Sequence, residues 1–165
     1  MPIIQLELSA ESVDEAIEKL RLYQETIEEA SERIVRRLAR DGEERARELV
    51  PVDTGALAES IVASGDGRVA YVRTDSPYAA FVEFGTGVIG AASPYPGPAM
   101  AEAGYAYMGG EHHITTKDGR DGWFWPGKDG RWYFTQGQPT KPFMYDTAQL
   151  LAMAVPQVVE EELKA

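Results

Sequence analysis

The chain has 165 residues, and a chain of this length buries roughly 68 to 70% of its unfolded surface on folding, so a real core is expected. Hydrophobic residues make up 44% and charged residues 26%, which is typical of a globular protein and excludes a collagen-like rod or a disordered tail. Acidic residues number 27 against 16 basic ones, for a net charge of −11, and the absence of cysteine excludes disulfides, zinc-thiolate sites and thiol nucleophiles.

Such an acidic chain is poorly suited to binding DNA non-specifically, because the affinity of such binding comes from basic side chains that neutralise phosphates. No stretch approaches the roughly 18 apolar residues of a membrane-spanning helix, and residues 1–5 lack the basic start of a secretory signal. We therefore expect no membrane partner and a protein that stays in the compartment where it is made.

Helical periodicity runs through residues 12–50, which contain no proline and a single glycine. The apolar residues that recur there at intervals of three and four are Val13, Ile17, Leu20, Tyr23, Ile27, Ala30, Ile34, Leu38, Ala46 and Leu49. We predict a short helix over residues 12–23 and a longer one over residues 25–49, with a mild bend near Gln24.

The ends of this helical segment also carry signals. Ser12 followed by Glu15 predicts a capping box at the start, and Pro51 stops the run. Four of the apolar residues are spaced by seven and also fit a coiled-coil seam, but the next heptad position is Asp41. We therefore favour a helix packed on a sheet over a coiled coil.

After the proline the chain changes to short segments separated by glycine and proline. Residues 61–74 predict a β-hairpin whose strands flank Gly65-Asp66-Gly67. Ser76 is a candidate N-cap for a short helix over residues 77–84, which the next glycine ends.

Residues 85–138 are predicted to be a loop and β-meander elaboration of a single domain, residues 1–165. Glycine and proline are frequent over residues 85–110, and a compact domain rarely keeps such an extended loop unless the loop is functional or contacts a neighbour. Two Lys-Asp-Gly-Arg turns, at 117–120 and 128–131, then separate the strands of an antiparallel meander. The strands are expected at residues 114–116, 123–125 and 132–135.

Residues 144–154 predict a C-terminal helix, and Pro156 either kinks it or opens a last short helix. Together the segments predict an α+β fold. Its parts are a long N-terminal helix packed on an antiparallel β-sheet, a short middle helix, an aromatic β-meander insertion and a C-terminal helix.

Motifs for cofactors and metals are weak. Gly85-Thr86-Gly87-Val88-Ile89-Gly90 matches the dinucleotide-binding pattern, but the prolines that follow argue against the helix that would receive a pyrophosphate. His112 and His113 are the only histidines, and neighbours on a strand point to opposite faces, so they cannot jointly chelate one metal ion. No Gly-x-Ser-x-Gly elbow marks a nucleophilic serine. We predict no cofactor and no metal.

Four carboxylates follow one another along the middle of the chain: Asp53, Asp66, Asp75 and Glu83. Their neighbours mark none of them as buried or catalytic. Capping of a short turn through Glu59, by Asp53 or Thr54 with Leu57 as the apolar anchor, explains the first one more simply. An acidic hydrolase that uses Asp53 or Glu83 is the least favoured function class, and we predict that the protein is not an enzyme.

Four arginines share one side of the long helix and could meet phosphate or an acidic partner: Arg33, Arg36, Arg37 and Arg40. Glu29 lies four residues before the first of them and Glu32 four before the second. A solvated, salt-bridged face is therefore the favoured interpretation.

Aromatic residues are concentrated in the predicted meander: Trp123, Phe124, Trp125, Trp132, Tyr133 and Phe134. Strand alternation sends half of the rings to each face, so one set can fill the core while the other is exposed. Exposed rings indicate an interface, for which Trp123, Trp125, Trp132 and Tyr133 are the candidates. A core-only role and a sugar-stacking platform built from the three tryptophans are the alternatives.

Three segments together resemble the tail-component or neck protein family of long-tailed bacteriophages, the siphoviruses. They are Pro51-Val52-Asp53-Thr54-Gly55-Ala56-Leu57 with Ser60-Ile61, then Tyr78-Ala79-Ala80-Phe81-Val82-Glu83-Phe84-Gly85-Thr86, then Pro139 through Pro142-Phe143-Met144 with Ala148. The resemblance covers most of residues 12–155 in order.

The resemblance implies a structural subunit of the head-to-tail connector, in a neck or tail-completion ring between the portal side of the capsid and the tail tube. It implies a homo-oligomeric ring whose neighbours are head-completion or portal-side proteins and tail-tube or tail-terminator proteins. DNA would pass through the lumen without specific binding, and the protein, made in the host cytoplasm, would lie in the virion.

No catalytic residue comes with the resemblance. Contacts in a ring must be heterologous, and we expect the loop over residues 85–110 and the aromatic meander to make them. A carbohydrate-binding module that uses an exposed tryptophan platform is the alternative function.

Overall fold

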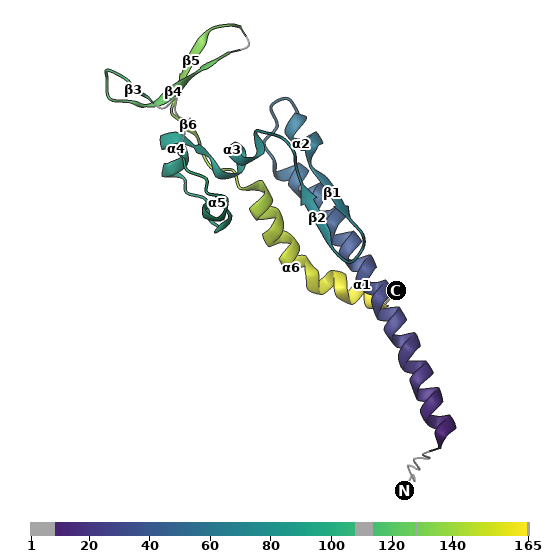
Figure 1. Cartoon of the computed structure of the whole chain (residues 1–165). Helices are drawn as coiled ribbons and strands as arrows, with labels where there is room; N and C mark the ends of the chain where they lie inside the picture. Colours follow the sequence, from purple (N-terminus) through teal and green to yellow (C-terminus); the bar gives the residue numbers. More distant parts are fainter. Residues whose placement is uncertain (1–8, 108–113, 128, 165) are drawn as a thin grey trace.

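The computed structural model describes residues 9–107, 114–127 and 129–164. This described part of the chain contains six helices and six strands, and their arrangement can be followed in Figure 1. In order they are α1 (Ala10–Leu49), α2 (Ala56–Ser60), β1 (Val62–Gly65), β2 (Ala70–Arg73), α3 (Ala79–Phe84), α4 (Gly87–Ala92), α5 (Ala99–Glu102), β3 (Ile114–Thr115), β4 (Asp121–Pro126), β5 (Trp132–Thr135), β6 (Gly137–Gln138) and α6 (Phe143–Lys164). The predicted α+β fold is confirmed.

Helix α1 is continuous over 40 residues, so the predicted bend near Gln24 is wrong. No glycine or proline occurs between residues 10 and 41, and the Gln24 side chain donates to Glu28 one turn later, so nothing near Gln24 breaks the helix. The predicted capping box is also wrong, because the N-cap is Ser9. The Ser9 hydroxyl accepts from the Ser12 N–H at 3.1 Å, and the Ser9 N–H donates to the Ser12 hydroxyl at 3.0 Å.

The core is small and lies along the C-terminal half of α1. Its buried members are Ala46, Val50, Ile61 and Phe143, and Leu57, Ala58, Val72, Ala79, Val82 and Met144 pack against them. Gly42 lets the hairpin and α6 approach α1 closely, since a Cβ there would lie 2.8 Å from Val72 Cγ2 and 2.9 Å from Leu151 Cδ1. Hairpin and α6 therefore cover this half of α1 together (Figure 1).

Strands β1 and β2 form the predicted antiparallel hairpin, with Ala63 opposite Val72 and Val62 opposite Arg73. Asp66 builds the turn: its Oδ1 accepts from the Arg68 and Val69 N–H groups at 2.9 and 3.0 Å. These backbone donors, the Val69 N–H first, hold the pKa of Asp66 below its ordinary value. The predicted packing of the long helix on a sheet holds for this hairpin.

Helix α6 runs through Pro156 to Lys164, longer than the predicted 144–154. It changes direction along its course in Figure 1, which a proline inside a helix explains, because the ring removes a backbone donor and crowds the preceding turn. It lies antiparallel to α1, with Leu151 beside Gly42 and Glu162 beside Arg33.

The segment from Gly85 onward is more ordered than predicted. Instead of one extended loop it contains α4 and α5, and its start pairs with β6 through bridges from Thr86 to Gln138 and from Gly87 to Gly137. The prediction of an extended loop is therefore wrong for the residues of α4 and α5, which are helical. The predicted meander is confirmed, with strand order β3-β4-β5.

The molecule is elongated. Its exposed surface is 12202 Å². A compact monomer of 18.2 kDa exposes about 8,100 Å². Even full exposure of the residues outside the described ranges would account for only about 2,500 Å² of this difference. Figure 1 shows the reason: the N-terminal half of α1 and the meander both extend away from the body.

Candidate functional site

Glu83 joins α3 to the start of α6. Its Oε2 accepts from the Met144 N–H at 2.9 Å and its Oε1 from the Tyr145 N–H at 3.0 Å, while the Tyr95 hydroxyl donates to Oε1 at 3.1 Å. The side chain therefore caps the N-terminus of α6 with a carboxylate, where the helix dipole favours negative charge. The second and third motif segments therefore contact each other through this residue.

Burial governs the ionisation of this carboxyl group. Glu83 is only 6% exposed, and burial raises its pKa above the ordinary value even though the three donors act in the opposite direction. Burial and the neighbouring carboxylate also raise the pKa of Tyr95, so its hydroxyl remains a donor. Both oxygens of Glu83 already accept hydrogen bonds from the chain, so the residue serves to hold α3 against the start of α6. We call this contact of Glu83 with Tyr95, Met144 and Tyr145 the joint.

The chain after Glu83 is held by backbone and hydroxyl contacts. Gly85 has a φ of +76°, and a Cβ there would lie 2.7 Å from the Thr140 N, so no other residue fits without strain. The Thr140 hydroxyl lies within hydrogen-bond distance of the Phe84 and Ser93 carbonyl oxygens. Thr86 Oγ1 accepts from the Gln138 N–H at 3.1 Å.

Aromatic rings pack around this joint. The Phe84 and Tyr95 rings meet edge to face with centroids 4.9 Å apart, and the Phe84 and Tyr105 centroids lie 5.1 Å apart. Tyr95 also contacts Tyr145 of α6 at 5.7 Å. The sequence did not single out Tyr95, Tyr105 or Tyr145. The only signal for Tyr95 was its place within the Pro94–Pro98 segment, which indicates extended chain and not its partners.

The Gly85–Gly90 motif lacks the context for a dinucleotide. It follows helix α3 and not a strand, as expected, but the expectation that no helix could form there is wrong, because α4 begins at Gly87. Its glycines are needed for packing: a Cβ on Gly87 would lie 2.3 Å from the Gln136 carbonyl oxygen, and one on Gly90 would lie 2.9 Å from the Tyr107 ring.

The Pro51–Leu57 motif makes the turn after α1. Gly55, with a φ of +86°, is the N-cap of α2, and no side chain caps that helix, so capping by Asp53 is wrong. Thr54 Oγ1 accepts from the Ala56 N–H at 3.4 Å, and Leu57 packs against the core as predicted. Tyr78 is the N-cap residue of α3, with its ring on the surface.

The four sequence-neighbouring carboxylates have separate surroundings. Asp53 and Asp75 are exposed, Asp66 is engaged in the hairpin turn, and Glu83 is buried at the joint. Within the described residues, no group of three or more histidine, aspartate or glutamate side chains is placed to hold a metal ion. His112 and His113 lie outside the described residues.

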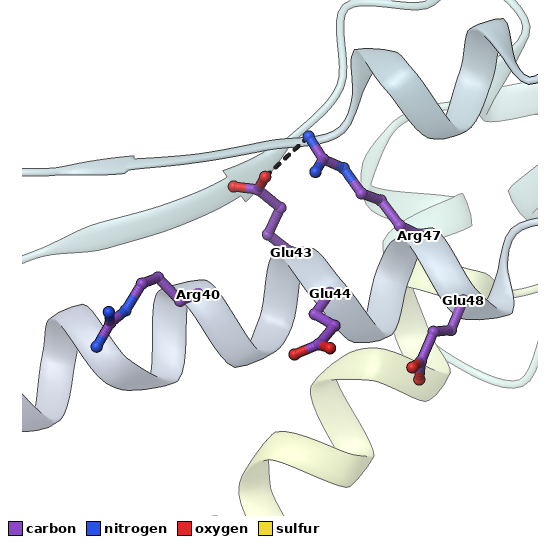
Figure 2. Close-up of a pocket in the computed structure, with 5 residues that line it drawn as sticks. All are labelled: Arg40, Glu43, Glu44, Arg47 and Glu48. Atoms are coloured by element: carbon purple, nitrogen blue, oxygen red, sulfur yellow. Dashed lines mark ion pairs between the residues drawn. The ribbon is translucent and has the colours of Figure 1, made fainter.

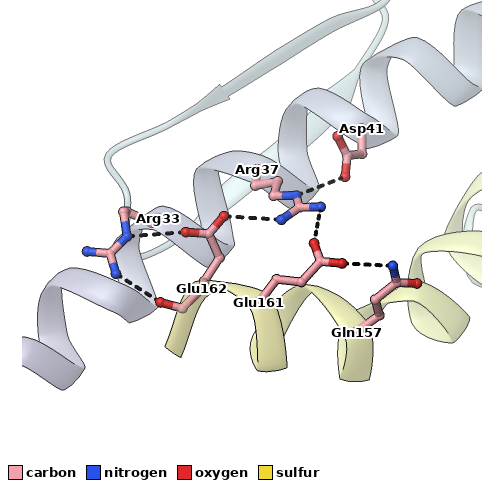
Figure 3. Close-up of polar contacts among 6 residues, drawn as sticks. All are labelled: Arg33, Arg37, Asp41, Gln157, Glu161 and Glu162. Atoms are coloured by element: carbon pink, nitrogen blue, oxygen red, sulfur yellow. Dashed lines mark hydrogen bonds and ion pairs between the residues drawn. The ribbon is translucent and has the colours of Figure 1, made fainter. Parts of the chain in front are cut away.

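The arginine face of α1 is tied to the end of α6 (Figure 3). Arg33 Nε lies 3.2 Å from Glu162 Oε2, and Arg37 reaches Glu161 at 2.7 Å as well as Glu162 at 3.2 Å. The hydrogen bonds that Arg37 donates, first to Glu161 and then to Glu162, raise the pKa of its guanidinium. The predicted salt-bridged face is confirmed for Glu32 and Arg36, at 2.8 Å, but Arg33 pairs with Glu162 of α6 instead of Glu29.

A shallow hollow on α1 is lined by Arg40, Glu43, Glu44, Arg47 and Glu48 (Figure 2). Arg47 pairs with Glu43 at 2.8 Å and donates to the Ile61 carbonyl oxygen, while Glu43 accepts from the Ala63 N–H at 2.6 Å. Since these two charges are occupied in attaching the hairpin to α1, the hollow is explained by the fold.

Both faces of the β4-β5 ribbon carry aromatic rings. Trp125 lies opposite Tyr133, with centroids 5.6 Å apart, and Phe124 lies opposite Phe134 at 5.4 Å. Trp132 pairs with Pro126, so by alternation it lies on the Phe124 face, away from Trp125. Trp125 and Trp132 are 48% and 67% exposed, so the core-only alternative is wrong for them. Trp123 is half-buried against Gly87.

One of three comparisons with known proteins gives a match. Residues 14–85, from α1 to the glycine after Glu83, match a family model described as "Bacteriophage HK97-gp10, putative tail-component". Neither a curated protein nor a solved structure matches the chain significantly. Over the described residues, the helices are too short or too polar to cross a bilayer. The match confirms the resemblance to tail and neck proteins of long-tailed phages over these residues, and it indicates a phage structural component located in the virion.

Proposed function

We propose that this chain is a subunit of the head-to-tail connector, in a neck or tail-completion ring that surrounds the DNA passage between the portal side and the tail tube. The observation that carries the proposal is the large exposed surface area of the chain. The chain exposes 12202 Å². A compact monomer of this mass exposes about 8,100 Å². A protein that works inside an assembly can leave surface uncovered that a monomer must bury.

The exposed apolar residues are grouped by element. The outer face of the hairpin carries Val62 and Tyr71, the meander carries Trp125 and Trp132, and α6 carries Met153 at 78% exposure. A ring requires one patch on each copy to meet a different patch on the next. The hairpin face and the meander lie at separate places along the molecule (Figure 1), which suits such heterologous contacts.

Charge supports a DNA passage without specific binding. The net charge is −11, and two of the α1 arginines, Arg33 and Arg37, are held by carboxylates of α6. A surface of the same sign as DNA repels the phosphates and lets the duplex move past. Because Glu83 is committed to capping α6, we propose no catalytic role for it and no enzymatic activity for the chain.

The same geometry disfavours the carbohydrate-binding alternative. A sugar-stacking platform needs its rings on one face, whereas Trp125 and Trp132 lie on opposite faces and Trp123 packs against Gly87. A titration with soluble glycans, followed by tryptophan fluorescence, should show no saturable change. Saturable binding that is lost in Trp125→Ala would replace the connector proposal.

The proposal is tested in particles. Electron microscopy of phage made without this protein should show filled heads and separate tails, whereas joined, infectious particles would overturn the connector role. Trp125→Ala and Trp132→Ala should lower the yield of joined particles, while Arg131→Ala should not. Arg131 is the matched control, because it is exposed in the turn between the same two strands and is not aromatic.

A further inference from the structure

The first half of α1, residues 10–29, stands apart from the body, and we call it the N-terminal arm. At 1.5 Å per residue the arm is about 30 Å long. Its apolar side chains are exposed, including Val13 at 50%, Leu20 at 67% and Tyr23 at 65%. Among the described residues, no other element lies beside it in Figure 1. A single helix of this length is marginal in water without a partner, so a covering element is expected.

The pattern of the arm is that of a coiled-coil seam. Apolar residues occupy the a and d heptad positions in order: Val13, Ala16, Leu20, Tyr23, Ile27 and Ala30. All seven acids of the arm fall at the outer positions b, c and f: Glu11, Asp14, Glu15, Glu18, Glu25, Glu28 and Glu29. The flanking e and g positions carry no acid: Ser12, Ile17, Lys19, Gln24, Thr26 and Ser31. Two such arms can therefore meet along the seam without placing acids opposite each other.

Helix α6 covers the other half of α1, where the heptad pattern no longer holds, because Asp41 stands at the next a position and the contact residue Gly42 at a b position. Helix α6 lies antiparallel to α1, from Leu151 beside Gly42 to Glu162 beside Arg33, and ends there. Ala30, the last seam residue before this contact, is 1% exposed, whereas the arm before it is uncovered. A second helix running in the direction of α6 would continue its path along the rest of α1.

Length and direction identify that second helix. The arm of another copy, laid antiparallel, would begin where α6 ends. It would then cover the whole of the uncovered seam, because the seam and the second copy's arm have the same length. A parallel arrangement would bring the α6 ends of both copies onto the same seam. We propose that the N-terminal arms of two copies of this chain pair as an antiparallel two-helix coiled coil, each taking on the other's α1 the place that α6 takes further along.

This pairing describes the free protein and does not depend on the proposed connector role. A two-fold contact turns the copies in opposite directions, whereas all copies in a polar ring point the same way. Entry into such a ring would therefore release the arms. The partner in this inference is the chain itself.

The first test is the association of the purified full-length chain. Sedimentation equilibrium should show dimers at tens of micromolar protein, and Leu20→Glu should raise the dimer dissociation constant at least tenfold. Leu22→Glu is the matched control, since Leu22 is 62% exposed but lies at an outer c position. A monomeric wild-type chain at 100 µM, or an equal loss in both variants, would overturn the proposal. Helix content by circular dichroism shows that each variant is folded.

The second test determines the direction of pairing. Because the sequence has no cysteine, an introduced cysteine is the only thiol that can react. Val13→Cys and Ile27→Cys chains are treated with a short bismaleimide, alone and mixed. An antiparallel pair cross-links the mixture strongly and each variant alone weakly, because position 13 of one copy lies near position 27 of the other. Efficient cross-linking of Val13→Cys alone indicates a parallel pair and overturns the proposal, as does the absence of any cross-link.

These outcomes are separable from the particle experiments. If the arms pair in solution but particles join without the protein, the connector role fails and the pairing stands. If the protein is required for joining but is monomeric, the pairing fails and the connector role stands.

Discussion

In the C-terminal half of α1 most apolar side chains are buried or half-buried beneath the hairpin and α6, with Leu49 the exception, whereas in the N-terminal half, residues 10–29, they are exposed. Both halves have the same helical periodicity in sequence. Ala46 in the second half is fully buried, and Leu20 in the first half is 67% exposed. Periodicity therefore identifies which face of a helix is apolar, but it does not say whether the covering element belongs to the same chain.

The largest expected effect comes from breaking the covered half. Phe143→Ala removes a ring that is 2% exposed and packed against Ala46 and Val50, so it should lower the free energy of unfolding by about 3–5 kcal/mol. Urea unfolding followed by circular dichroism measures the change. Met153→Ala on the exposed side of the same helix is the control, and an equal loss there would show that the core has been misplaced.

The joint between α3 and α6 should be the next most sensitive position. Glu83→Ala leaves the Met144 N–H, the Tyr145 N–H and the Tyr95 hydroxyl without their acceptor, which should cost about 2–4 kcal/mol in unfolding free energy. The same urea titration applies. Asp53→Ala, in the exposed turn, should change stability by less than about 0.5 kcal/mol. Similar losses in the two variants would contradict the capping role of Glu83.

The ionisation of Glu83 gives a smaller effect with a definite sign. Because burial raises its pKa in the folded state, the folded protein binds a proton more readily than the unfolded chain as pH falls from 7 toward the ordinary glutamate range. The stability of wild type relative to Glu83→Gln should therefore increase on acidification through that window. Unfolding free energies of both proteins at pH 7 and pH 5 test this, and a relative decrease would indicate a lowered pKa instead.

The smallest effect is expected in the arm. Leu20→Ala should change the unfolding free energy by no more than about 0.5 kcal/mol in dilute protein, because the side chain is 67% exposed. Val158→Ala, at a side chain that is 4% exposed in α6, should cost about 0.5–2 kcal/mol and is the contrasting variant. A loss at Leu20 as large as at Val158 would remove the distinction between the two halves of α1.

Local signals accounted for most of the elements. Glycine, aspartate and strand alternation predicted the hairpin around Asp66 and the meander, and the glycine after Phe84 predicted the end of α3. Two boundaries were wrong: Ser9 caps α1 in place of Ser12, and α6 does not end at residue 154. Of the two alternatives for Pro156, the one that keeps it inside the same helix is confirmed. At the start of α1 the choice is local, because Ser9 and Ser12 bond each other reciprocally and the chain before Ser12 can also be helical.

The joint could be predicted only in part. The motifs around Glu83 and Phe143 indicated that both residues matter, but not that Glu83 caps the helix that Phe143 begins, since 61 residues separate Glu83 from Met144. Pairing of Arg33 with Glu162 was missed for the same reason, because a glutamate four residues before Arg33 offered a local partner. Contacts between distant segments depend on chain topology, which periodicity does not contain.

The most direct test of the central claim, that the uncovered surface serves assembly, is an electron cryomicroscopy map of the intact virion with this chain located in it. The account predicts copies of the chain in a ring at the head-to-tail junction, with the Trp125 and Trp132 faces of the meander covered by neighbouring subunits. A map with no copy at the junction, or with copies whose meander and hairpin faces stand free in solvent, would contradict it.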